Sequence, residues 1–154
     1  MKSIFRAVLW IAVFLGISYL IGEATRANMD WYDTLDKPEL TPPKLAFPIV
    51  WTTLYVMLAI VGSRLWGRRK DAAAQAPIIL FSIYMIMNWA WSFIFFVGHY
   101  IGAGFAWIVL SDIVLLALIL RLSQSKKLDA ALLIPTLLWG TFAAYLNGYI
   151  YWFH

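Results

Sequence analysis

Polar and aromatic side chains alternate at helical spacing in residues 87–96, MNWAWSFIFF. If this stretch is helical, one face carries the positions i, i+3, i+4 and i+7, which are Asn88, Trp91, Ser92 and Phe95. Lipid offers no hydrogen-bond partner, so a face with a carboxamide and a hydroxyl should point into a helix bundle. Two interpretations stay open: a ligand-binding wall, or hydrogen bonds that only hold neighbouring helices together.

Asp112, in the sequence VLSDIVLL, is the one carboxyl group deep inside an apolar run. An ionisable group at that depth is costly and is a functional candidate. We expect it to be neutral, which would let it act as a hydrogen-bond donor, and since no buried Lys or Arg is evident, we expect Asn88 or a tryptophan N–H as its hydrogen-bond partner. The alternative is an ordinary hydrogen bond between helices.

The last apolar run presents two faces of different character. Gly140, Ala144 and Gly148 recur every four residues, a pattern that allows close helix packing within a bundle or between protomers. The neighbouring face joins a flat ring to a small residue and a polar tip, and is the better candidate for a ligand. Its predicted lining residues are Trp139, Phe142, Ala143, Leu146 and Asn147.

The segment WYDTLDKPELTPPKLAFPIVW, residues 31–51, is stiffened by four prolines, including Pro42 and Pro43. Proline fixes its own φ and pushes the preceding residue out of helical geometry. We therefore predict that the loop 23–47 is a lid over the outer mouth of a bundle. The alternative is that Trp31, Tyr32 and Trp51 merely anchor the segment at headgroup level.

The composition defines the elements that must position these residues. The chain has 154 residues, of which 63% are hydrophobic and 13% charged, too apolar for the surface of a small soluble domain. Apolar runs near 20 residues can cross a bilayer as helices. We predict an all-α integral membrane protein, a single domain of five transmembrane helices at about 4–22, 48–66, 77–97, 102–122 and 128–152.

The basic residues predict an orientation. With five spans, nine of the twelve lysines and arginines fall on one side of the membrane, and Arg26, Lys37 and Lys44 fall on the other. The positive-inside rule then places the N-terminus in the cytoplasm, and the first loop and the C-terminus outside. The net charge of +4 is explained by this asymmetry, so we expect no nucleic-acid partner.

Several site types are not expected. Cysteine is absent, and the two histidines, His99 and His154, are far apart in sequence, so no metal site is predicted. No pattern resembles a hydrolytic triad or a phosphate-binding loop. The many aromatic rings with few polar tips suit a large, flat, apolar ligand instead.

Four segments carry a family resemblance: WYDTLDKPELTPPKLAFPIVWTTLYVML, MNWAWSFIFF, SDIVLL and LLWGTFAAYLN, in this order. They resemble the tryptophan-rich sensory proteins, bacterial relatives of the mitochondrial translocator protein, the peripheral-type benzodiazepine receptor. The resemblance covers essentially the whole chain. It implies a five-helix bundle, commonly a homodimer, whose pocket beneath the first loop binds porphyrins, notably protoporphyrin IX, and isoquinoline or benzodiazepine-like drugs.

The resemblance also assigns positions. Trp51 and Trp139 match the two tryptophans linked in the family to light-dependent porphyrin breakdown. The matched pocket positions are Tyr32, Asn88, Trp91, Ser92, Phe95, Asp112 and Ala143. The family varies at Trp91 and Phe95. Eukaryotic members end in a sterol pattern that needs a cation after a tyrosine, and here only WFH follows Tyr151, so sterol transport is not expected.

The leading hypothesis is therefore a receptor in the bacterial cell membrane for porphyrins, linked to stress or light regulation, with ligand transport left open. The alternative is a photo-oxidase in which Trp51 or Trp139 gives an electron to an excited porphyrin. No cofactor is required, and the porphyrin is the ligand. Because neither histidine lies mid-span, metal-free porphyrin suits the site better than haem. Its propionates should face outward, near Lys37, Lys44 or Arg26.

Overall fold

The computed structural model describes residues 1–154 and is all-helical, as expected. Its α-helices are α1 (Lys2–Arg26), α2 (Met29–Asp33), α3 (Ala46–Gly67), α4 (Gln75–Ser92), α5 (Ile101–Ser123) and α6 (Lys127–Phe153). A 3₁₀ turn, Ala72–Ala74, precedes α4, and a π-helical turn, Phe93–Val97, follows it. Five helices are long and apolar enough to cross a membrane, which confirms the predicted five-helix membrane fold.

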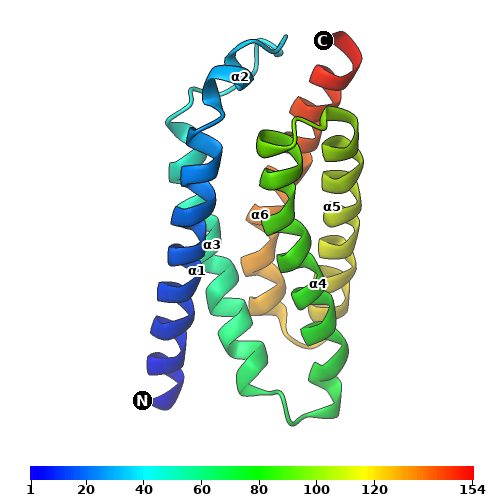
Figure 1. The fold of residues 1–154 in the computed structure, drawn as a ribbon. Coiled ribbons are helices and arrows are strands. Elements are labelled where there is room, and N and C mark those ends of the chain that lie inside the picture. The colour runs from blue at the N-terminus through cyan, green and yellow to red at the C-terminus, as the bar shows by residue number, and fades with distance from the viewer.

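The long helices run up and down between two ends of a bundle (Figure 1). The N-terminus and the connections α3–α4 and α5–α6 lie at one end, which we call the basic end. The connection from α1 to α3 lies at the opposite end together with the C-terminus, and we call this the loop end. Helices α1 and α3 pack side by side, and α5 packs between α4 and α6.

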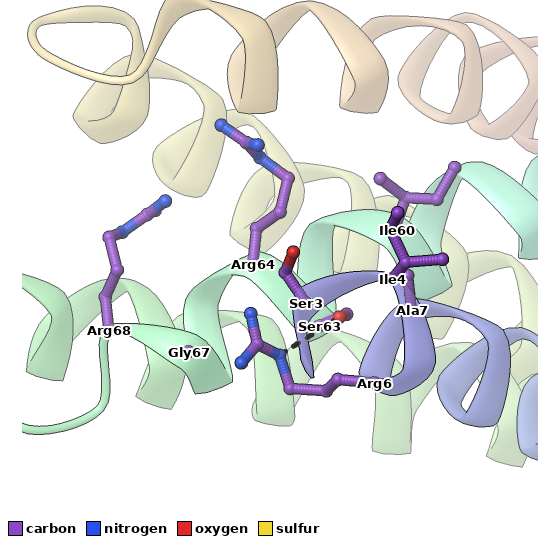
Figure 2. Close-up of a pocket in the computed structure, with 9 residues that line it drawn as sticks. All are labelled: Ser3, Ile4, Arg6, Ala7, Ile60, Ser63, Arg64, Gly67 and Arg68. Atoms are coloured by element: carbon purple, nitrogen blue, oxygen red, sulfur yellow. Dashed lines mark hydrogen bonds between the residues drawn. The ribbon is translucent and has the colours of Figure 1, made fainter. Parts of the chain in front are cut away.

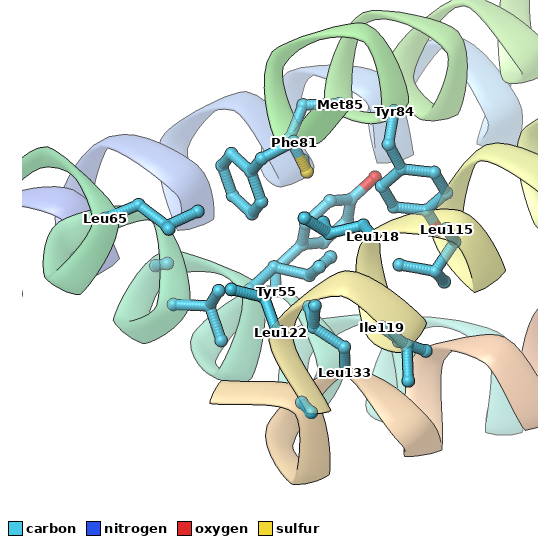
Figure 3. Close-up of a cluster of buried hydrophobic side chains, with 14 of the residues drawn as sticks. Tyr55, Leu65, Phe81, Tyr84, Met85, Leu115, Leu118, Ile119, Leu122 and Leu133 are labelled. Atoms are coloured by element: carbon cyan, nitrogen blue, oxygen red, sulfur yellow. The ribbon is translucent and has the colours of Figure 1, made fainter. Parts of the chain in front are cut away.

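The main core lies where α3, α4, α5 and α6 meet. Leu58, Leu115 and Leu133 are fully buried there, together with the aromatic rings of Tyr55 and Tyr84 (Figure 3). The outward faces remain strongly apolar. Large side chains such as Phe5 and Leu20 on α1 are 72% and 68% exposed, because lipid rather than protein is the neighbour that this surface fits.

The small-residue stripe on α6 packs inside the bundle. A Cβ at Gly148 would lie 2.8 Å from the Phe105 ring, and a Cβ at Gly140 would collide with the Asp112 carboxyl group on α5. The stripe therefore serves the contact between α5 and α6, and of the two interpretations left open by the sequence, packing within one chain is correct.

The first connection differs from its prediction. Residues 23–26 belong to α1, residues 46 and 47 belong to α3, and a short helix, α2, forms within the predicted loop 23–47. We call residues 27–45 the first loop. Pro48 and Pro77 are third residues of their helices rather than first ones. Both positions lie in the first turn, where an N–H has no helical partner, so proline costs little there as well.

Candidate functional site

The first loop covers the loop end of the bundle with aromatic and aliphatic side chains. Tyr32 and Leu35 are 6% and 5% exposed and form a second apolar cluster with Phe95 and Ile150. The Tyr32 ring also lies 5.6 Å from the ring of Phe96 and 6.5 Å from that of Phe47. The loop thus plugs the mouth between the outer ends of α3, α4 and α6.

Contacts from elsewhere in the chain hold the loop in place. The Trp31 indole stacks on the His99 ring with centroids 3.9 Å apart, and a His99 ring nitrogen lies 3.3 Å from Asn28 Oδ1. His99 has a φ of 58°, a left-handed conformation that a non-glycine residue adopts uncommonly. At the C-terminus, the backbone N–H of Asp36 donates to His154 Nδ1 over 3.2 Å.

The pKa of Tyr32 is raised to about 12, first because burial disfavours the phenolate and then because the Asp33 carboxylate lies nearby. Tyr32 is therefore neutral at physiological pH. Its backbone carbonyl accepts a 2.8 Å hydrogen bond from the Lys37 ammonium, which also lies 4.6 Å from the centre of the Tyr32 ring. These contacts fold residues 32–37 into a compact unit.

Asn88 bridges two buried tyrosines. Its Oδ1 accepts a 2.6 Å hydrogen bond from the Tyr55 hydroxyl, and its Nδ2 donates to the Tyr84 hydroxyl over 3.2 Å. This links α3 to α4, so at Asn88 the structure favours interhelical hydrogen bonding. The sequence analysis did not predict the two tyrosines as partners, because no sequence pattern marks a tyrosine within a transmembrane helix as the hydrogen-bond partner of a particular amide.

Asp112 does not have the partner that we expected. It forms no hydrogen bond with Asn88, whose amide bonds Tyr55 and Tyr84, or with a tryptophan indole. Its carboxyl group lies instead against the backbone at Gly140. The absence of a Cβ at this glycine lets α5 and α6 approach closely, and the carboxyl group occupies the space that a side chain would fill.

Trp91 joins α4 to α6. Its indole N–H donates to Asn147 Oδ1 over 3.3 Å, and its ring stacks on Phe95 with centroids 5.3 Å apart. Asn147 in turn donates to the Ala143 carbonyl over 3.2 Å. The predicted polar face of α4 and the predicted face of α6 therefore meet. Ser92, the last residue of α4, has no hydrogen-bond partner for its hydroxyl among the side-chain bonds of the structure.

A π-helical turn that the sequence did not reveal follows Ser92. The Gly98 N–H donates to the Phe93 carbonyl, five residues back, over 2.8 Å. Such turns shift the register of a helix and are frequent at functional sites. Here the turn allows Phe95 and Phe96 to pack edge to face, with centroids 5.0 Å apart, against the same loop residues.

Trp139 lies beside the start of α3. Its ring packs edge to face against Phe47 at 5.9 Å and lies 5.6 Å from Phe142. Its indole N–H is buried and has no hydrogen-bond partner, a state that it shares with the Trp89 indole and the Thr136 hydroxyl. Buried donors are nearly always paired, so these three groups are exceptions within the bundle.

Trp51 lies apart from this group. Its ring packs against Tyr55 with centroids 5.4 Å apart, at the edge of the main core. No ring contact joins it to Trp139, whose ring neighbours are Phe47 and Phe142. The structure brings Trp31, Tyr32, Trp91, Phe95 and Asn147 together beneath the first loop. The predicted residues Leu146, Ala143, Phe142 and Trp139 follow along α6 toward its middle, where Trp139 contacts Phe47, a ring neighbour of Tyr32. A joint role for Trp51 and Trp139 stays a prediction.

Two cavities stand out in the structure, and neither lies beneath the first loop. One, of about 390 Å³, lies between α1 and α3 at the basic end, and the other, of about 180 Å³, lies between α1, α3 and α4. At the loop end, Tyr32 and Leu35 of the loop are buried against Phe95 and Ile150. The structure contains no cluster of three or more His, Cys, Asp or Glu side chains that could hold a metal ion.

The protein has five apolar helices and an aromatic cluster beneath one connecting loop. It is therefore an integral membrane protein with a candidate ligand site at one end. The TspO/MBR family model matches residues 7–153. The chain belongs to the TspO/MBR family.

Individual relatives agree with this assignment. The chain is 33% identical over 148 residues to the tryptophan-rich protein TspO of Chlorobaculum tepidum, covering 95% of this chain and 94% of the relative. It is 34% identical to the translocator protein of Ovis aries, covering 87% and 78%. It is 30% identical to the protein CrtK of Rhodobacter capsulatus, covering 76% and 74%. The suspected relationship to the tryptophan-rich sensory and translocator proteins is confirmed.

Proposed function

We propose that the protein is a membrane receptor for porphyrins of the protoporphyrin IX type, and for other flat apolar molecules such as isoquinoline or benzodiazepine-like drugs. The carrying observation is the Trp139 indole N–H, which is buried without a partner beside Phe47, and Phe47 is in turn a ring neighbour of Tyr32 in the aromatic cluster beneath the first loop. Aromatic walls gain from stacking on a flat ligand, and one free donor fixes its orientation.

Binding requires the first loop to move. Tyr32 of the loop occupies the space beside Phe95, so a macrocycle enters there only when the loop lifts or shifts sideways. The Phe47 ring, at the start of α3, must also turn away before a ligand reaches Trp139. The polar contacts that hold the loop are exposed: the Lys44–Asp33 and His154–Asp36 pairs involve side chains that are 37–71% exposed. Exposed pairs contribute about 0–1 kcal/mol each, so local opening is cheap relative to global unfolding.

The propionates of a porphyrin would meet the cations of the loop. Arg26 is paired with Glu23 over 2.9 Å, and Lys44 is paired with Asp33. Both pairs are exposed, and a ligand carboxylate can replace either acidic partner at little cost. Lys37 is less available, because it donates to the carbonyls of Tyr32 and Leu35. Arg26 and Lys44 are therefore the better candidates.

We also propose the orientation that the charges predict, with the basic end in the cytoplasm and the loop end outside the bacterial cell membrane. Since the small-residue stripe of α6 is used within the chain, a homodimer would have to form through another apolar face. The receptor would serve tetrapyrrole-linked regulation, and transport of the ligand is a further role that flux into proteoliposomes would test.

The experiment is a titration of the detergent-solubilised protein with protoporphyrin IX, followed through the Soret absorption of the porphyrin. Binding should saturate in the wild type and weaken about tenfold in Trp139→Phe, which loses the free N–H, and in Ala143→Phe, which fills the site. Trp152→Phe is the matched control, since Trp152 lies at the same end and is 74% exposed. Equal affinity in all four proteins contradicts the proposal.

A further inference from the structure

A basic cavity lies at the end of the bundle opposite the first loop. It has a volume of about 390 Å³ and is formed by the first turns of α1 and the last turns of α3 (Figure 2). Three arginines line it, Arg6, Arg64 and Arg68, with the hydroxyls of Ser3 and Ser63 between them. No carboxylate lines it.

The positive charge of this cavity exceeds what the protein neutralises. Arg64 Nε and Arg68 Nη2 both bind Asp129, at 2.5 and 2.8 Å, and Asp129 is fully buried behind them. Two cations thus share one carboxylate. Arg6 has only a neutral partner, because its Nε donates to Ser63 Oγ over 3.3 Å. The three arginines and Asp129 together carry a net charge of +2, which faces the cavity.

The position of Arg6 in the cavity is fixed by packing and by a buried hydrogen-bond partner. The guanidinium of Arg6 lies directly over Gly67, where a Cβ would come within 2.7 Å of Arg6 Cζ. Ser63, which orients this guanidinium, is 1% exposed. Several guanidinium donors fixed around one space match the acceptor oxygens of a phosphate group, which Arg binds through charge-assisted hydrogen bonds.

The other side of the cavity is apolar and opens toward the lipid-facing surface. Ile4, Ala7 and Ile60 line it, and Ile4, 68% exposed, continues into the apolar outer face of α1. Helix α1 has 25 residues and is about 37 Å long at 1.5 Å per residue, so its first turns reach the headgroup level of a core about 30 Å thick. An amphipathic molecule with a phosphate head fits both walls.

We propose that this cavity binds the phosphate of an anionic phospholipid, with its acyl chains along Ile4 and the outer face of α1. Basic pockets between transmembrane helices are suited to such headgroups. The net charge favours a lipid with uncompensated negative charge over a zwitterionic one. This inference is independent of the porphyrin proposal, since it uses no residue of the loop end.

The test is native mass spectrometry of the full chain in detergent, titrated with phosphatidylglycerol or phosphatidylcholine. Phosphatidylglycerol should bind the wild type more tightly than phosphatidylcholine. Arg6→Gln should weaken phosphatidylglycerol binding about fivefold to tenfold. Arg121→Gln is the matched control: Arg121 is an exposed arginine at the end of α5, outside the cavity, and its loss should leave binding unchanged.

A second pair of variants avoids any change to the arginines. Ser3 is exposed in the first turn of α1, where an acidic residue favours the helix. Ser3→Glu places a negative charge in the cavity and should reduce phosphatidylglycerol binding without unfolding the protein. Ser3→Gln, which adds no charge, should leave phosphatidylglycerol binding unchanged. Circular dichroism confirms that each variant is folded.

Two results would overturn the proposal. The first is equal lipid affinity in Arg6→Gln, Arg121→Gln and the wild type, which would assign the binding to nonspecific surface charge. The second is displacement of phosphatidylglycerol by inorganic phosphate at similar concentration, which would identify a site for a soluble anion rather than for a lipid.

Discussion

The two ends of the bundle are held together by different physics. At the loop end, rings of Trp31, Tyr32 and Phe95 pack against one another, and the polar contacts are mostly exposed. At the basic end, the buried carboxylate of Asp129 ties two arginines of α3 to α6. The hydrophobic effect that dominates the burial of these rings is non-directional, so the rings can rearrange around a guest. The buried carboxylate of Asp129 is instead satisfied only while both arginines keep their places. The loop end is therefore suited to exchange a ligand, and the basic end to stay fixed.

The largest effect should come from removing the fixed network. Asp129→Ala leaves the guanidinium groups of Arg64 and Arg68 without their acceptor near the membrane boundary, and should lower the free energy of unfolding by about 2–4 kcal/mol. Unfolding in mixed micelles with increasing sodium dodecyl sulfate measures this. A loss no greater than that of Asp71→Ala, an exposed aspartate at the same end, would show that the network is not needed for stability.

The next largest effect concerns the close contact between α5 and α6 at Gly140, midway between the two ends of the bundle. Gly140→Leu must displace the Asp112 carboxyl group and separate α5 from α6, at a cost of about 1–3 kcal/mol. The same unfolding assay applies, with Ala106→Leu as the control, because Ala106 is exposed on the outer face of α5. Equal stability of the two variants would mean that the close approach at Gly140 is not tight.

A smaller and local effect is expected at the loop end. Trp31→Ala removes the stack on His99 and the contact with Phe95. These ring contacts stabilise the loop by about 1 kcal/mol in addition to the contribution of the buried apolar surface. The variant should be cleaved faster by trypsin after Lys44, the loop lysine that is not followed by proline, while global unfolding changes little. Trp152→Ala at the same end is the control. Unchanged cleavage would show that the stack does not hold the loop.

The smallest signal is the ionisation of Tyr32. Its pKa is raised to about 12 in the folded protein, above the ordinary value for tyrosine, so the folded state favours the neutral phenol. The stability that this adds is fully present below pH 10 and is lost as the pH rises through about 12. The tyrosinate absorbance difference between wild type and Tyr32→Phe should therefore titrate near pH 12. A midpoint near 10 would place Tyr32 in water.

The number of transmembrane helices could be predicted from the sequence, because it depends only on the length of the apolar runs. Runs near 20 apolar residues predicted five spans, and the structure has them. The ends of the first span were wrong, because Glu23 and Arg26 form an i, i+3 ion pair that lets α1 continue past its apolar core. Helix α2 was missed, because its five residues, Met29–Asp33, carry too little pattern to be recognised as a helix.

The candidate site was predicted only in part. Helical spacing and the family resemblance together selected Trp91, Asn147 and Trp139. The structure joins Trp91 to Asn147 near the loop end and places Trp139 at the middle of α6, beside Phe47. They could not give the π turn after Ser92 or the partners of Asn88, since those depend on contacts between helices far apart in sequence. The expected partner of Asp112 was wrong for the same reason: Asn88 is already engaged by two tyrosines.

The most direct test of the account is a structure of the protein with protoporphyrin IX bound. We expect the macrocycle at the loop end, in contact with Phe95 and Trp139, with the Trp139 N–H bonded to the ligand and the first loop displaced from its present position. A macrocycle bound on the outer, lipid-facing surface, or in the arginine cavity at the basic end, with the loop end packed as it is now, would contradict the account.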